Sequence, residues 1–417
     1  MYPVKSFRLV IVLLLAFAGS LQIAVFAQSK PQKPETPTGS QRKNQRPAPQ
    51  TEEEKKKAEE EKKQVEEEKN AVEDPGVLKL ETNIVNVDAV VYNKKTGQII
   101  TGLKKENFAV FENGVKQEIA NPSTPEVPIT MTMVVEYSKL SEALGYYANR
   151  GMEDGKMEVV RPAAYFLSTF IKPPNDYASL IAFDIRPPPI TDFTNDPNRL
   201  RQSVDILLRN SPAFRETNLF DALKFALVGG RGDSVVLDDS KQATADYGGM
   251  VDVKAKRRAI ILVASGIDTF SKINYDQVRK IIQSAGIPIY ILSTGNLFYK
   301  LYEGQLDAVD GIDGSPGRLT FLQAQNAMNT FAKESGGQHF PITFPGEIPD
   351  ALKSINNLLR NQYSLSYDAG DKPHDGKKYK IEVKVDVNGD GNFNNKDYVV
   401  QNRPFYIAPN DTPAKKK

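Results

Sequence analysis

Oxygen-bearing side chains recur at regular places in the twelve residues from 386 to 397. Carboxylates or amides occupy the first, third, fifth, ninth and twelfth places, and Gly391 at the sixth place permits a sharp turn. The full set is Asp386, Asn388, Asp390, Asn392, Asn394 and Asp397. Because Ca²⁺ prefers carboxylate and amide oxygens, this segment is a candidate site for a structural calcium ion.

The segment resembles the calcium loops of EF-hand and dockerin modules, with two departures. Asp397 stands in place of the usual glutamate, and the loop joins two predicted strands, whereas those modules join helices. The alternative is a polar hairpin, since Asn-Gly at 388–389 and Asp-Gly at 390–391 are also favoured turn pairs. If calcium binds, we expect it to order a β-domain outside the cell.

A second group of carboxylates and hydroxyls lies in the middle of the chain, where predicted strands end or a helix begins. It comprises Glu136, Ser138, Thr217, Ser265 and Asp268. The carboxyl ends of parallel strands meet at one edge of a sheet, and ligands bind there. We therefore expect these side chains to share one rim.

The elements that would position this rim alternate between strands and helices over residues 128–362. Continuous apolar strands are predicted at 130–135, 179–183, 259–263 and 287–292. Helices are predicted before residue 171, from Asp196-Pro197 onward, and around 219–227, 278–282, 321–333 and 348–359. This pattern predicts an α/β fold with a doubly wound, mostly parallel, Rossmann-like sheet that is covered by helices on both faces.

Two segments with period-two alternation flank this α/β region. Residues 78–122 alternate at Val85, Val87 and Val91 and contain an Asn-Gly turn at 113–114, which indicates a hairpin. Residues 363–409 return to alternation around 381–385. We expect the two segments to pair into one small flanking β-sandwich, followed by a loose tail at 410–417.

Three stretches of the α/β region, taken in order, resemble the von Willebrand factor A domain. They are VVEYSKLS at 134–141, ETNLFDAL at 216–223 and LVASGIDT at 262–269. The order of segments is more narrowly similar to the VWFA-related proteins of acidobacteria, with FAVFENG at 108–114 before the domain and QYSLSY at 362–367 after it. The resemblance covers roughly residues 78–408 and implies a partner-binding α/β domain.

The resemblance also implies a metal-ion-dependent adhesion site, which this sequence matches only in part. In that site an Asp-x-Ser-x-Ser turn, a threonine and a further aspartate hold Mg²⁺, and the ion accepts a carboxylate from the partner. Ser138 and Thr217 match the pattern, whereas Glu136, Leu140 and Ser265 stand where Asp, Ser and Asp are expected. We expect these departures to weaken Mg²⁺ binding severely.

Two interpretations of this degenerate adhesion site stay open. In one, Glu136, Ser138, Thr217 and Asp268 form a rearranged metal site. In the other, Ser138 and Thr217 only cap helices.

The first 76 residues have the character of an export signal and a tether. Lys5 and Arg8 precede an apolar run, and Val-Phe-Ala at 25–27 suits cleavage, so residues 1–27 are predicted to be a signal peptide. An uncleaved anchor is the alternative, since the apolar run reaches Phe26. Residues 28–76 are predicted to be a disordered region followed by a charged helical tether.

Composition excludes several classes of function. The chain has 54 Lys and Arg against 52 Asp and Glu, which gives no bulk electrostatic reason to bind nucleic acid. There is no cysteine, and therefore no disulfide, thiolate nucleophile or Cys-based metal site. The two histidines, His339 and His374, lie near no nucleophile motif, so we expect no enzymatic activity.

These observations predict an exported, non-enzymatic protein-binding or adhesion module of the periplasm, cell envelope or extracellular space. Its protein partner is unknown, and no membrane span is expected after signal cleavage. The alternative is a structural cell-envelope protein in which the calcium-stabilised β-domain does the binding.

Overall fold

The computed structural model describes residues 84–120, 127–145, 154–232, 245–370 and 376–408. The predicted signal peptide, the tether and the tail at 410–417 lie outside these residues.

A six-stranded sheet forms the centre of the α/β domain, in the order β11-β10-β9-β4-β5-β6. Neighbouring strands are parallel except β6, which runs antiparallel to β5 at one edge. The strands are β4 (Ile129–Glu136), β5 (Tyr177–Phe183), β6 (Pro189–Thr194), β9 (Arg257–Ala264), β10 (Ile289–Ser293) and β11 (His339–Pro341). The predicted fold class, a mostly parallel α/β sheet, is confirmed.

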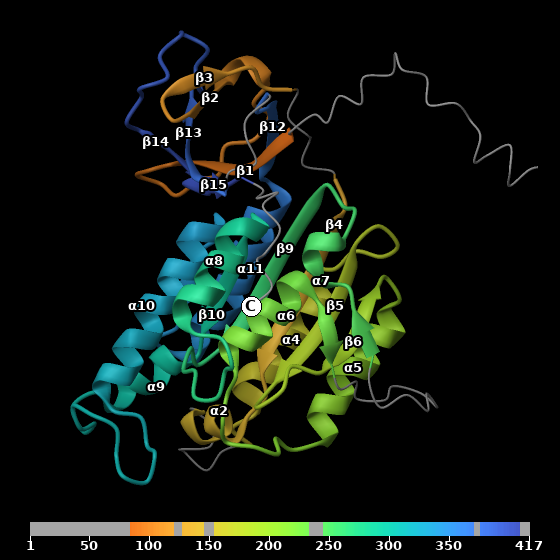
Figure 1. The fold of residues 1–417 in the computed structure, drawn as a ribbon, viewed down its shortest axis with the longest axis vertical. Helices are drawn as coiled ribbons and strands as arrows, with labels where there is room; N and C mark the ends of the chain where they lie inside the picture. Colours follow the sequence, from red (N-terminus) through yellow and green to blue (C-terminus); the bar gives the residue numbers. More distant parts are fainter. Residues whose placement is uncertain (1–83, 121–126, 146–153, 233–244, 371–375, 409–417) are drawn as a thin grey trace, which may run out of the picture. The chain divides into compact units, whose positions relative to one another are not determined.

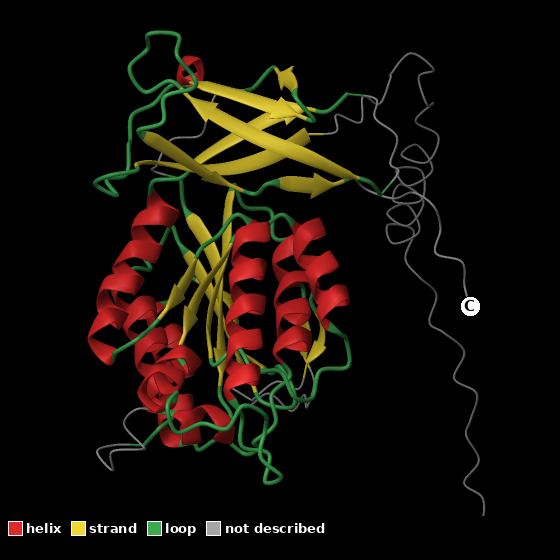
Figure 2. Ribbon diagram, turned by 90° about the vertical axis from the view of Figure 1, so that its left-hand side faces the viewer, coloured by secondary structure: helices red, strands yellow, loops and turns green. Residues whose placement is uncertain are grey.

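Helices cover both faces of this sheet (Figures 1 and 2). They are α2 (Lys139–Leu144), α4 (Met157–Thr169), α5 (Pro197–Arg209), α6 (Leu219–Val228), α7 (Gly249–Asp252), α8 (Tyr275–Ala285), α9 (Gly295–Tyr302), α10 (Arg318–Ser335) and α11 (Ile348–Arg360). One core packs α4, α5 and α11 against Met131 and Met133 of β4, and the other packs α6, α8 and α10 against Val134. Because apolar side chains point to both faces, every residue of β4 is buried.

Helix α5 begins as its sequence predicts. The Asp196 carboxylate accepts a hydrogen bond from the Asn198 amide at 2.9 Å, and Pro197 occupies the first turn, where its missing amide hydrogen is not needed. A short two-stranded ribbon, β7 (Gly230–Gly232) and β8 (Ala245–Tyr247), follows α6.

The flanking β-structure combines segments from before and after the α/β domain. One sheet has the order β12-β1-β14 and the other β15-β13-β2-β3. The strands are β1 (Ile84–Asn93), β2 (Phe108–Glu112), β3 (Val115–Gln117), β12 (Tyr363–Asp368), β13 (Lys378–Val385), β14 (Tyr398–Asn402) and β15 (Phe405–Ile407). The two sheets share one core that includes Val87, Leu365, Val110 and Val383.

The hairpin predicted at Asn113-Gly114 is confirmed. It joins β2 to β3 with Glu112 opposite Val115. Asn113 has a φ of 47° and Gly114 a φ of 86°, the left-handed conformations that a tight two-residue hairpin turn requires.

Candidate functional site at the rim of the sheet

Glu136 joins the ends of the two central strands. It is the last residue of β4, and Ser265 follows β9 directly. The amide and the hydroxyl of Ser265 each donate to Glu136 Oε2 at 2.7 Å, and the Ser138 hydroxyl donates to Oε1 at 3.1 Å. Both carboxylate oxygens of Glu136 therefore accept hydrogen bonds from the protein.

Thr217 connects the loop before α6 to the loop after β9 through hydrogen bonds. Its hydroxyl donates to the Ile267 carbonyl at 2.6 Å, and its amide donates to the Thr269 hydroxyl at 2.8 Å. In return, the amides of Thr269 and Phe270 donate to the Thr217 carbonyl. The three loops singled out in the sequence thus lie together at the carboxyl end of the sheet.

Burial controls the charge of Glu136. The side chain is fully buried, and this desolvation raises its pKa from 4.5 to about 6, although the hydrogen bonds from Ser265 and Ser138 act in the opposite direction. The negative charge of Asp268 also contributes to the rise. The rim therefore holds a carboxylate whose neutral form is favoured by its surroundings.

The rim residues do not fit a Mg²⁺ ion in this arrangement. Glu136, Ser138 and Thr217 are each 0% exposed, and their oxygens are engaged in hydrogen bonds within the protein. An Mg²⁺ site needs several oxygens directed at one point, together with positions open to water or a ligand. Across the described ranges, no group of three or more His, Asp or Glu side chains could hold a metal ion.

The helix-cap interpretation applies to one of the two hydroxyl residues. Ser138 caps α2, since its hydroxyl oxygen accepts a hydrogen bond from the Ser141 amide at 3.0 Å. Thr217 does not cap α6, because Asn218 occupies the cap position and the Thr217 hydroxyl is directed at the loop after β9.

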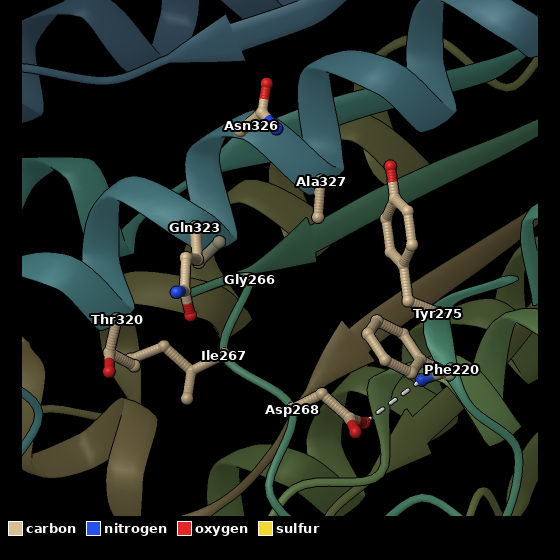
Figure 3. Close-up of a pocket in the computed structure, with 10 residues that line it drawn as sticks. Phe220, Gly266, Ile267, Asp268, Tyr275, Thr320, Gln323, Asn326 and Ala327 are labelled. Carbon is tan, nitrogen blue, oxygen red and sulfur yellow. Dashed lines mark hydrogen bonds between the residues drawn. The ribbon is translucent and has the colours of Figure 1, made fainter.

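Asp268 has a different environment from Glu136. It is partly exposed and lines a pocket of about 340 Å³ between the loop after β9 and helix α10 (Figure 3). Its Oδ1 accepts hydrogen bonds from the Phe220 amide and the Ser271 hydroxyl. The residues that line the pocket are Phe220, Gly266, Ile267, Asp268, Tyr275, Thr320, Gln323, Ala324, Asn326 and Ala327.

Aromatic rings and helix α10 form facing walls of this pocket. Figure 3 shows Phe220 and Tyr275 along one side and Thr320 and Gln323 along the other. The Phe220 and Tyr275 rings meet edge to face at 6.3 Å, and buried Phe331 stacks on Tyr275 at 5.4 Å. Packing of this kind holds the rings in place.

Gly266 allows the loop after β9 to approach α10. Its φ is +89°, and a Cβ atom at this position would lie 2.2 Å from Cε of Met328. A larger residue would therefore force the buried Met328 side chain to move and would strain the backbone at this positive φ. The pocket was not predicted from the sequence, although Gly266 is a residue type that can indicate a close approach of the backbone.

Large apolar side chains are exposed on loops of the same rim. Phe270 lies beyond Asp268 and is 56% exposed, and Val309 and Ile312 lie in the connection between α9 and α10. Arg215, in the loop before α6, donates to the Gly314 carbonyl of this connection at 3.2 Å. The connection is therefore tied to the rim.

In the predicted calcium loop, Asp386 is cradled by backbone amides. Its carboxylate accepts hydrogen bonds from Gly389 and Asp390 at 2.9 and 3.3 Å on Oδ1, and from Gly391 at 2.7 Å on Oδ2. Desolvation raises the pKa of Asp386, but these hydrogen bonds outweigh it and the pKa is lowered.

The remaining oxygen-bearing side chains of this loop are exposed, among them Asn388, Asp390 and Asn392. Asp397 lies 3.6 Å from the Lys95 ammonium, and the Asn394 side-chain oxygen accepts a hydrogen bond from Lys384 at 3.4 Å. Calcium binding at this loop stays a prediction.

Among the described helices, none has both the length and the apolar character needed to cross a membrane.

No protein-family model matches the chain, and no curated protein matches it. Several solved structures are similar to parts of it. The vWF domain of the type V pili tip protein Mfa5 from Porphyromonas gingivalis is 20% identical with a TM-score of 0.24, over 34% of this chain and 39% of that one. The PilB minor pilin from Streptococcus sanguinis is 10% identical with a TM-score of 0.39, over 68% and 88%.

The conserved hypothetical protein BatB from Bacteroides thetaiotaomicron is 13% identical with a TM-score of 0.32, over 56% of this chain and 96% of that one. The match to the Mfa5 domain spans well under two thirds of that domain's length.

Proposed function

We propose that this chain is an exported, non-enzymatic protein-binding module of the adhesion type. It holds a polypeptide partner at the carboxyl-end rim of the six-stranded sheet, the position at which open α/β sheets bind ligands. The resemblance of the strand-end loops to the von Willebrand factor A domain supports the same position.

The observation that carries this proposal is the exposure of large apolar side chains on the loops of the rim. Phe270, Val309 and Ile312 present large apolar side chains to solvent. The loop of Phe270 and the connection that carries Val309 and Ile312 are each hydrogen-bonded to the loop before α6. Single apolar residues are ordinary on a surface, but several on the loops at one edge of a rigid scaffold, where a pocket also opens, are typical of an interaction site.

Binding at this rim would proceed without a metal ion. The degenerate adhesion site uses its oxygens internally, and the partner would contact the apolar side chains and the pocket directly. We also propose that the chain belongs to the acidobacterial group of VWFA-related proteins.

The non-enzymatic assignment is supported by the state of His339. Partial burial in β11 lowers the pKa of His339 to about 4, so this imidazole is a weak base that stays neutral at physiological pH. Export to the periplasm, cell envelope or extracellular space is supported by the signal-peptide pattern at residues 1–27.

The test is a peptide-display selection on the whole chain, followed by affinity measurements on matched variants. Phe270→Ser with Ile312→Ser alters the rim, and Val115→Ser removes an apolar side chain of similar exposure from the β-domain. We expect the rim variant to lose at least about tenfold in affinity, since two buried apolar contacts are worth more than 1.4 kcal/mol. The Val115 variant should bind as the parent does.

The opposite outcome would favour the alternative function. If selected peptides bind the rim variant normally, lose affinity in Val115→Ser and require Ca²⁺, the binding site lies in the β-domain. The α/β domain would then have a structural role.

A further inference from the structure

We propose that the pocket beside Asp268 receives a basic side chain, arginine or lysine, from the polypeptide partner. This inference rests on the proposed function and gives its binding site a chemical preference. Three features of the pocket support this inference: its negative charge, its aromatic wall and the unfavourable desolvation of the Asp268 carboxylate by a neutral occupant.

The charge of the pocket is negative. Among its ten lining residues, Asp268 is the acid and none is basic. Two of its hydrogen bonds come from the Phe220 amide and the Ser271 hydroxyl, which fix the carboxylate on the side of the loop. A cation that enters the pocket would therefore meet a carboxylate already held in place.

The aromatic wall provides a second contact for a cation. Phe220 and Tyr275 line the same pocket as Asp268, and their edge-to-face packing holds the two rings in this wall. Guanidinium and ammonium groups are attracted to such ring faces. Across the pocket, the Gln323 amide and the Thr320 hydroxyl offer oxygens to the remaining N–H donors.

The environment of Asp268 disfavours a neutral occupant. Desolvation raises the pKa of Asp268, although hydrogen bonds oppose this, and the nearby negative charge of Asp221 adds to the rise. A neutral side chain would remove further water from this carboxylate without supplying a compensating charge. A basic side chain supplies that charge, so it is the occupant that the pocket favours.

The charge of the partner group expected here is opposite to the charge implied by the family resemblance. A metal-ion-dependent adhesion site presents a cation and takes a carboxylate from its partner. Here the oxygens of Glu136, Ser138 and Thr217 form hydrogen bonds with one another and with their neighbours, and the charge that lines the pocket is the partly exposed carboxylate of Asp268. The same edge of the fold would thus select a basic group.

The experiment compares charged and neutral probes of the same shape. N-acetyl-arginine methylamide and its citrulline counterpart are titrated against the whole chain, with binding followed by ligand-observed NMR. A charge-assisted hydrogen bond is worth about 1.5–3 kcal/mol, so we expect arginine to bind at least about tenfold more tightly than citrulline. Equal binding of the two probes would overturn the inference.

Two isosteric variants localise the effect. Asp268→Asn keeps an oxygen that can accept from the Phe220 amide but removes the charge. Asp313→Asn makes the same change on the connection between α9 and α10, outside the pocket lining. We expect the arginine preference to vanish in the first variant and to persist in the second. Its persistence in Asp268→Asn, or its loss in Asp313→Asn, would contradict the assignment.

A third variant keeps the inference testable if Asp268→Asn does not fold. Tyr275→Leu leaves the carboxylate and removes one ring, and an exposed cation–π contact is worth about 0.5–1 kcal/mol. We expect arginine binding to weaken about threefold while citrulline binding changes less. An equal effect on both probes would show that the ring does not contact the charge.

The failures of the two proposals are distinguishable. If display-selected peptides depend on Phe270 but the probes show no preference for arginine, only the basic-side-chain inference is wrong. If the probes show the preference but selected peptides ignore the rim, the proposed function is wrong and the pocket chemistry stands.

Discussion

Replacing Glu136 by glutamine should stabilise the protein at neutral pH. Both oxygens of Glu136 accept hydrogen bonds in a site with no exposure to solvent. The amide oxygen of glutamine could accept from the Ser265 amide, and its NH₂ group could donate to the Ser138 hydroxyl oxygen. Glu136→Gln therefore keeps the connection between β4 and β9 and removes a buried charge.

The size of the effect follows from the pKa of Glu136. Desolvation raises this pKa from 4.5 to about 6, a difference that corresponds to about 2 kcal/mol. Because the folded-state pKa is the higher one, the stabilisation from the protonated carboxyl is fully present below pH 4.5. It is lost as the pH rises through about 6. At pH 7 we expect the glutamine variant to be more stable than the parent by about 2 kcal/mol.

The assay is urea unfolding of both proteins at several pH values from 4.5 to 7. Circular dichroism is a suitable signal because the chain has no tryptophan. The difference in unfolding free energy between the two proteins cancels the other titrating groups. A difference that does not change with pH, or a parent that is the more stable protein at pH 7, would refute the account of Glu136.

Three further changes test other parts of the structure. Ca²⁺, but not Mg²⁺, should raise the melting temperature measured by scanning fluorimetry, and Asp390→Ala should abolish that rise. An unchanged melting temperature in Ca²⁺ would show that the loop at 386–397 does not bind calcium. Gly266→Ala should lower the free energy of unfolding by about 1–3 kcal/mol, because Gly266 has a φ of +89° and the new Cβ atom would clash with the Met328 side chain. An unchanged urea midpoint would show that the backbone at Gly266 is not constrained. Tyr247→Phe should lower the free energy of unfolding by about 1–3 kcal/mol in the same assay, because the buried hydroxyls of Thr132 and Ser179 each form a hydrogen bond of 2.8 Å with the Tyr247 hydroxyl. An unchanged free energy of unfolding would mean that the two remaining hydroxyls satisfy each other.

The central strands and the hairpin could be predicted because local pattern decides them. β4 and β9 are continuous apolar runs, and the Asn113-Gly114 turn requires its two residues. β6 was missed because it begins at Pro189 after two further prolines, and proline is tolerated only at the edge position that this strand occupies. The short helix α9 was also missed, since it follows β10 with almost no intervening polar turn.

The meeting of the three loops could be predicted, but their chemistry could not. The parallel order of strands brings Glu136 and Ser265 together, and the sequence contains both residues. Whether the oxygens of Glu136 face a metal ion or the protein depends on side-chain directions that no spacing specifies. The exchange of hydrogen bonds between Thr217 and the loop after β9 is likewise a tertiary property.

The pocket could not be predicted because its walls come from four separate elements: α6, the loop after β9, α8 and α10. Phe220 and Tyr275 lie on apolar helix faces, where aromatic residues ordinarily belong to a core. Gln323 lies on the exposed side of α10, where a polar residue needs no special explanation. The packing of α6, α8 and α10 with the loop at Gly266 brings these side chains next to Asp268.

The most direct test of a metal-independent rim is the affinity of one rim-dependent peptide, measured by calorimetry in excess Mg²⁺ and again in EDTA. Because the oxygens of Glu136, Ser138 and Thr217 are engaged within the protein, we expect the two affinities to be equal. A loss of binding in EDTA that Mg²⁺ restores, and that Thr217→Ala abolishes, would show that these residues hold a metal ion after all.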